Sequence, residues 1–271
     1  MATEVSRYPW KTLLFLVTVG TLTGPLIIPY AIGLNMIATG HPPPQSLSSF
    51  VIARFIQNLC FLAPAAAMGL WIGPEIGLGA PYLQHWLDDA PRPREPFLSV
   101  VGPAFSWAVA TAIIAFAIDG FFRGVLRIDF PAPEIHARIN VHWWRSVLAS
   151  FWAPWAEEVF DRLFLLSLLV WLVTKLFRVS GNRLGRWLAL SSAILATSLF
   201  FAWYHISNEA LFVSPVPAIV AVRTVLIITP AGIALGWMYV SRGLEAAVIS
   251  HFIMDLLVHG VRPIVEHGLT T

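Results

Sequence analysis

Four ionisable side chains lie within six residues of one another, directly before a strongly apolar run. Glu157, Glu158, Asp161 and Arg162 are followed by residues 163–173, which contain no charged residue. A charged group in hydrocarbon is costly, so such a cluster is expected only where it faces a protein interior or a water-filled cavity. The sequence therefore predicts a functional centre at this position.

The charges of this cluster do not balance. Glu158 and Arg162 are four residues apart with the acid first, which is the favourable order for an ion pair on a helix. Three carboxyl groups nevertheless face one arginine. At least one carboxyl is expected to hold a proton unless a protonated histidine or a bound cation compensates. A glutamate beside a histidine in such a setting is suited to take a proton from water.

Two further pairs of residues with helical spacing lie in later apolar segments. Phe201 precedes His205 by four residues, and His251 precedes Asp255 by four residues. Residues four apart lie on one face of a helix. The second pair therefore allows a carboxylate to orient an imidazole, which is a common arrangement at histidines that act in acid–base chemistry.

Composition places the chain among helical membrane proteins. Of its 271 residues, 57% are hydrophobic and 12% are charged, whereas soluble domains carry about 25% charged residues. The net charge of +2 gives no indication of a nucleic-acid partner, and the lone Cys60 excludes a disulfide within the chain. The prediction is an all-α, polytopic integral membrane helix bundle, surrounded by membrane lipid.

Seven apolar segments are expected to cross the membrane: 12–36, 50–72, 98–119, 147–174, 187–207, 216–240 and 244–262. A break of the sixth segment near Thr229 and Pro230 would give eight transmembrane helices. Because no internal repeat is evident, residues 1–271 are expected to form a single membrane domain. N-terminal spans and a polar loop over 73–97 make up residues 1–97, and the catalytic core spans occupy 147–262.

The distribution of basic residues predicts the orientation of the chain. With the N-terminus in the cytoplasm, the cytoplasmic side holds nine of these residues, Arg7, Lys11, Arg92, Arg94, Lys175, Arg178, Arg183, Arg186 and Arg242. The other side holds five, Arg123, Arg127, Arg138, Arg145 and Arg262. Because Lys and Arg are more frequent in cytoplasmic loops, the N-terminus is expected inside.

Several known ways of cutting a bond inside a membrane lack their residues here. The sequence contains no His-Glu-x-x-His, no Gly-x-Gly-Asp and no Gly-x-Ser-Gly. A zincin-type metalloprotease, an aspartyl protease of the presenilin type and a serine nucleophile are therefore not indicated. Glutamate together with histidine remains as the set of residues that could carry such a reaction.

The three motifs resemble the signature of the CPBP family, which includes the CAAX proteases and bacteriocin-processing enzymes. Glu157-Glu158-x-x-x-Arg162, Phe201-x-x-x-His205 and His251-x-x-x-Asp255 occur in that order, each on an apolar segment. The resemblance covers about residues 150–260. It implies an all-helical bundle around a conical catalytic cavity and intramembrane endoproteolysis of the glutamate type, as in the type II CAAX prenyl endopeptidase.

Carried over to the matching positions, the resemblance implies a catalytic role for four residues. Glu157 would activate water with assistance from His205, and His251 with Asp255 would polarise the scissile carbonyl and stabilise the oxyanion. Family members with Asn at the last position can donate a hydrogen bond. Asp255 is expected instead to orient or charge His251, or to be protonated itself.

The resemblance also implies supporting residues and a class of substrate. Glu158 and Arg162 would pair and fix the helix that carries the first motif. The substrate would be a membrane-associated protein or peptide, with a prenylated CAAX-type tail as one form. No cofactor is implied.

Two alternatives use the same residues differently. Glu157, Glu158, His205 and His251 offer oxygen and nitrogen ligands, so the site could bind a divalent metal and act as a metal-dependent membrane protease. The chain could also be a non-proteolytic membrane scaffold or immunity-type protein that retains the fold. In that case Glu157→Gln would leave the biological function intact.

Overall fold

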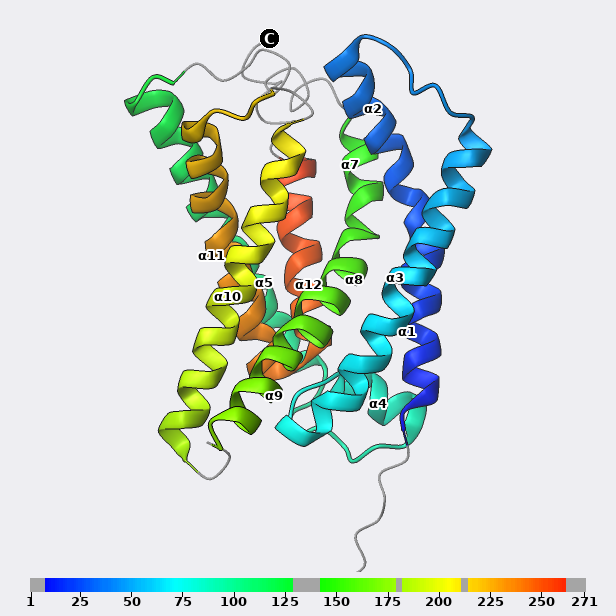
Figure 1. Cartoon of the computed structure of the whole chain (residues 1–271), viewed down its shortest axis with the longest axis vertical. Helices are drawn as coiled ribbons and strands as arrows, with labels where there is room; N and C mark the ends of the chain where they lie inside the picture. The colour runs from blue at the N-terminus through cyan, green and yellow to red at the C-terminus, as the bar shows by residue number, and fades with distance from the viewer. Residues whose placement is uncertain (1–7, 129–141, 179–181, 211–213, 262–271) are drawn as a thin grey trace, which may run out of the picture.

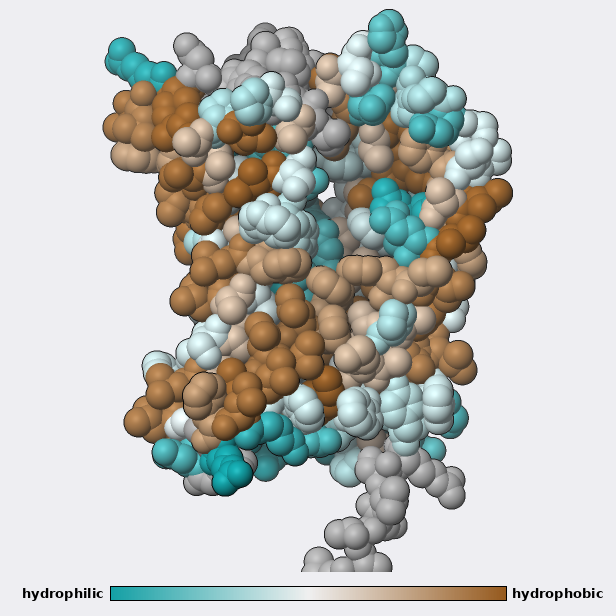
Figure 2. All heavy atoms as spheres, in the orientation of Figure 1, coloured by the Kyte–Doolittle hydropathy of each residue, from teal (hydrophilic) through white to brown (hydrophobic). Residues whose placement is uncertain are grey.

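The computed structural model describes residues 8–128, 142–178, 182–210 and 214–261. Within these ranges every regular element is helical, so the all-α prediction is confirmed. In this part of the chain, six helices are long and apolar enough to cross a membrane, and hydrophobic residues cover much of the outer face of the bundle (Figure 2). The chain is a multi-pass integral membrane protein, and the count of seven crossings stays a prediction.

Three helices from the N-terminal part form one side of the bundle (Figure 1): α1 (Trp10–Thr23), α2 (Ile28–Thr39) and α3 (Leu47–Ile76). The first expected span is interrupted by a 3-10 turn, η1 (Gly24–Ile27), which contains Pro25. Ser46 caps α3, because its hydroxyl oxygen accepts from the amide of Ser49 at 3.2 Å.

The segment 73–97 was expected to be a polar loop, and this was wrong in part. It contains the short helix α4 (Pro81–Asp88), in which Tyr82 and Leu83 are buried. A proline in the first turn is well suited to start a helix, and the amide of Leu83 donates to the carboxylate of Glu245 at 2.8 Å. The segment therefore contributes apolar side chains to the core at one end of the bundle.

Three other helices form the opposite side (Figure 1): α5 (Leu98–Gly120), α10 (Arg183–Glu209) and α11 (Ala218–Arg242). A π-helical turn, η2 (Phe121–Val125), extends α5. Asp119 of α5 forms a buried ion pair with Arg223 of α11. Because α11 continues through Pro230, the break that would have given eight spans is not observed.

The elements between the two sides carry the first and third motifs: α7 (Trp143–Ser150), α8 (Ala153–Glu158), η3 (Val159–Leu166), α9 (Ser167–Leu176), α12 (Leu244–Asp255) and η4 (Leu256–Val261). The fourth expected span is not one regular helix, since a turn separates α7 from α8 and η3 is a π-helix. π-helical turns are frequent at functional sites. The acidic cluster thus lies where the helix is irregular.

Contacts at one end of the bundle join segments that contain several of the basic residues predicted to be cytoplasmic. The amide of Lys11 donates to the carboxylate of Asp88 at 3.0 Å, and the guanidinium of Arg186 donates to the carbonyl of Ile76 at 3.2 Å. The starts of α1 and α10 therefore lie beside α4 and the end of α3 (Figure 1). The cytoplasmic position of this end stays a prediction.

A glycine allows α3 to pack closely on η3. A Cβ atom at Gly69 would lie 2.7 Å from the carbonyl carbon of Leu163, which is closer than real Cβ contacts. Leu163 is fully buried in the main hydrophobic core. This approach of two backbones fixes the position of the segment that carries Asp161 and Arg162.

The variant Gly69→Ala should lower the free energy of unfolding by about 1–3 kcal/mol, because the neighbouring backbone cannot yield as a side chain would. The midpoint of thermal unfolding in detergent measures this effect. Gly102→Ala is the matched control, since nothing lies within 4 Å of a Cβ at that helical position and alanine should stabilise by about 0.5–1 kcal/mol. An unchanged midpoint for Gly69→Ala would contradict the close packing.

Candidate active site

The three carboxyl side chains of the acidic cluster differ in their access to solvent. Those of Glu158 and Asp161 are 0% and 1% exposed, whereas that of Glu157 is 22% exposed. A group that takes a proton from water must be able to reach water. Of these three, Glu157 meets this requirement.

Arg162 joins the first motif to the helices around it. Its Nε lies 3.4 Å from Oε2 of Glu158, so the expected ion pair is present. Its guanidinium lies over the ring of Phe201, 5.1 Å from the centroid, and donates to the carbonyl of Gly232 at 3.5 Å. Through these contacts the buried cation ties η3 to α8, α10 and α11.

Asp161 has a partner that sequence analysis missed. The hydroxyl of Tyr204 donates to its carboxylate at 3.0 Å, and the Arg162 guanidinium lies 3.8 Å away. The ring of Tyr204 also stacks on the imidazole of His205, with centroids 4.8 Å apart. The available signal was a tyrosine directly before the histidine of the second motif.

His251 is the point at which the carboxyl groups meet. Its Nδ1 donates to Oε1 of Glu158 at 2.8 Å. Its Nε2 lies 3.8 Å from Glu157 and 3.6 Å from Asp255. Helical spacing thus places Asp255 beside the imidazole, but at a distance longer than a direct hydrogen bond, which a bridging water would suit.

His205 enters the site through Phe201. Its Nδ1 donates to the Phe201 carbonyl at 2.7 Å. The Phe201 ring lies 4.5 Å from the ring of His205 and 6.1 Å from that of His251. Among the described residues, His205 makes no hydrogen bond or ion pair with Glu157, so the expected assistance does not take the form of a direct contact.

A cavity of about 770 Å³ adjoins these groups. His205, His251 and Asp255 line it together with other polar residues, which include Asn35, Arg54, Asn208, Glu209, Arg223 and Thr224. Figure 2 shows a hollow between the two sides of the bundle, with hydrophilic residues inside a largely hydrophobic surround. Its volume is in the range of pockets that bind small molecules or short peptide segments.

The donors for a metal ion are not assembled in the described ranges. No group of three or more His, Cys, Asp or Glu side chains there is arranged to hold one. The Nδ1 atoms of His205 and His251 are both engaged in hydrogen bonds, with Phe201 and Glu158, and Nε2 is the ring nitrogen left for a ligand. The metal-dependent alternative stays a prediction.

Residues 139–257 match a protein family described as Type II CAAX prenyl endopeptidase Rce1-like. The matched range includes all three motifs, from Glu157 to Asp255. No curated protein and no solved structure matches the chain. The resemblance noted in the sequence is thus confirmed over this range.

Arg162→Met should lower the free energy of unfolding by about 3–5 kcal/mol, because it leaves Glu158 and Asp161 buried without their cation. Thermal unfolding in detergent measures the loss. Lys175→Met is the control, since its ion pair with Glu75 has side chains 59% and 43% exposed and such pairs contribute at most about 1 kcal/mol. Equal losses in the two variants would argue against an anchoring role for Arg162.

Proposed function

Because residues 139–257 match the Rce1-like family of type II CAAX prenyl endopeptidases, we propose that this protein is an intramembrane endopeptidase that uses a water molecule activated by Glu157. The observation that carries the proposal is the accessibility of this carboxyl group. It lies 3.8 Å from His251, which lines the cavity, while the adjacent Glu158 is fully buried and paired.

In the proposed reaction, Glu157 takes a proton from water, and the water oxygen attacks the carbonyl carbon of the scissile bond. The carbonyl oxygen then carries the negative charge of a tetrahedral intermediate. When this intermediate collapses, the carbon–nitrogen bond breaks and the proton held by Glu157 passes to the leaving amine. No bond forms between protein and substrate.

We assign stabilisation of the oxyanion to Nε2 of His251. As an imidazolium, His251 donates from Nδ1 to Glu158, which fixes the orientation of the ring, and keeps the N–H of Nε2 to donate to the oxyanion. Asp255, 3.6 Å from Nε2, acts as a positioning residue for this imidazole, because an ionised carboxylate would itself repel an oxyanion. His205 contributes from the cavity wall, where its Nδ1 is held by Phe201.

The proposed substrate is a membrane-associated protein or peptide, with a prenylated CAAX-type tail as the first candidate. The family points to this class. The cavity has a largely apolar lining with polar side chains among it and opens within a hydrophobic surround (Figure 2), which suits a peptide that arrives from the membrane with a lipid attached.

Glu157→Gln should reduce cleavage by about 10²–10⁴-fold, since the amide cannot accept the proton from water. Its thermal midpoint should stay near that of the wild type, because the side chain is partly exposed and forms no close ion pair. Mass spectrometry of a farnesyl-cysteine peptide with a CAAX tail, incubated with purified protein in detergent, measures the loss.

Glu75→Gln is the matched control for this experiment. That carboxylate binds Trp171 and Lys175 away from the cavity, so cleavage should equal that of the wild type. Cleavage should also persist in a chelator, whereas a loss restored by added metal would favour the metal-dependent alternative. Wild-type activity of Glu157→Gln would refute the proposed base, and an intact biological function without cleavage would favour the scaffold.

A further inference from the structure

Arg54 and Arg223 both line the cavity, but they differ in their partners. Arg223 forms a buried ion pair with Asp119. Arg54 has no carboxylate partner among the described residues. Its guanidinium donates to Oε1 of Gln57 at 3.3 Å and lies over the ring of Trp152, 5.4 Å from the centroid. An arginine within a membrane span normally has a counter-charge, so a negatively charged ligand is the expected partner.

The position of Arg54 is fixed by its surroundings. Its Cγ lies so near η1 that a Cβ at Gly24 would be 3.4 Å from it. The Trp152 ring supports the guanidinium, and Trp152 directly precedes α8, the helix that carries Glu157. The cation is therefore held one side chain away from the helix of the proposed base.

We propose that Arg54 binds the free C-terminal carboxylate of the peptide substrate. This inference rests on the proposed function. A guanidinium can donate two parallel hydrogen bonds to a carboxylate, which makes arginine well suited to this group. Glu209 and Asp255, which line the same cavity, would repel a carboxylate and so favour its placement at Arg54.

A peptide carboxylate fits this position better than the phosphate of a lipid headgroup. Arg54 shares its cavity with His205 and His251, so an anion bound there lies in the same cavity as the proposed scissile bond. The support from Trp152 also holds the guanidinium toward the motif helix. A headgroup would instead require the guanidinium to face the lipid.

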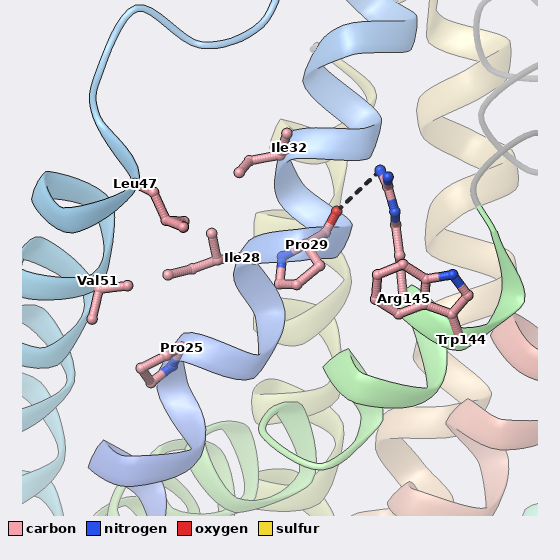
Figure 3. A pocket seen from close by; sticks show the side chains of 8 residues that line it. All are labelled: Pro25, Ile28, Pro29, Ile32, Leu47, Val51, Trp144 and Arg145. Atoms are coloured by element: carbon pink, nitrogen blue, oxygen red, sulfur yellow. Dashed lines mark hydrogen bonds between the residues drawn. The ribbon is translucent and has the colours of Figure 1, made fainter.

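Arg145 offers a matched control in a different environment. It also lacks a carboxylate partner within the described ranges, donates to the carbonyl of Pro29 at 3.5 Å and lies beside Trp144. It lines another, apolar crevice of about 300 Å³ between α2, the start of α3 and α7 (Figure 3). The two histidines do not line that crevice.

The test compares two farnesyl-cysteine peptides with the same CAAX tail, one a free acid and the other a C-terminal amide. Binding is measured with the Glu157→Gln protein, which leaves the peptide uncut, and cleavage with the otherwise wild-type protein. We expect the acid to bind about 10–100-fold more tightly, as for a lost hydrogen bond between charged groups, with a similar preference in kcat/KM.

The substitution Arg54→Gln, added to both proteins, should remove this preference. It should weaken binding of the acid peptide and leave binding of the amide peptide unchanged. Arg145→Gln should keep the preference. If the glutamine variant folds poorly, Arg54→Lys provides the second measurement, because it retains the charge but loses the planar fork and should lose part of the preference.

The outcomes separate this inference from the proposed function. Three results would overturn the carboxylate site: equal binding of the acid and amide peptides, no binding of either, or equal weakening of both by Arg54→Gln. Cleavage by the wild-type protein would still support the endopeptidase in each case. An acid preference that depends on Arg54, without cleavage, would retain the site and refute the proposed function. A third outcome would assign Arg54 to the binding of a lipid headgroup. In that case the wild-type protein retains anionic phospholipid, the Arg54→Gln variant loses it, and neither protein prefers the acid peptide over the amide.

Discussion

Burial of one cation organises the site. Arg162 is fully buried and can be stable there only with counter-charges and acceptors close by. Glu158 and Asp161 supply the charges, and the Phe201 ring and the Gly232 carbonyl complete its surroundings. The elements that contribute these groups must therefore meet for the chain to fold. Glu158 also accepts from His251, which extends the same constraint to α12.

This constraint gives adjacent acids different roles. Consecutive residues of a helix point about 100° apart, so Glu157 and Glu158 cannot share one environment. Glu158 faces Arg162 and is fully buried, whereas Glu157 keeps contact with solvent beside His251. The π-helix begins directly after this pair, at Val159. The accessible carboxyl group proposed as the base is therefore positioned by its buried neighbour.

Sequence reasoning succeeded where helical spacing alone decides a contact. Glu158 meets Arg162, and Asp255 lies beside His251, because each pair is four residues apart on one element. It could not predict the contact of Tyr204 with Asp161, which are 43 residues apart and meet only through the packing of α10 on η3. The segment 73–97 was mistaken for a loop because its prolines, glycines and charges mask the short helix that buries Tyr82.

The arginines within the bundle show what composition cannot reveal. By sequence, Arg54 and Arg223 are equivalent: each is a lone cation in an apolar segment, and each could extend toward the membrane surface. In the structure, both line one cavity, yet Arg223 has a carboxylate from its own chain and Arg54 has an aromatic ring and an amide. In a medium of low polarity, a charged side chain that its neighbours hold in place but do not neutralise is expected to bind a ligand of opposite charge.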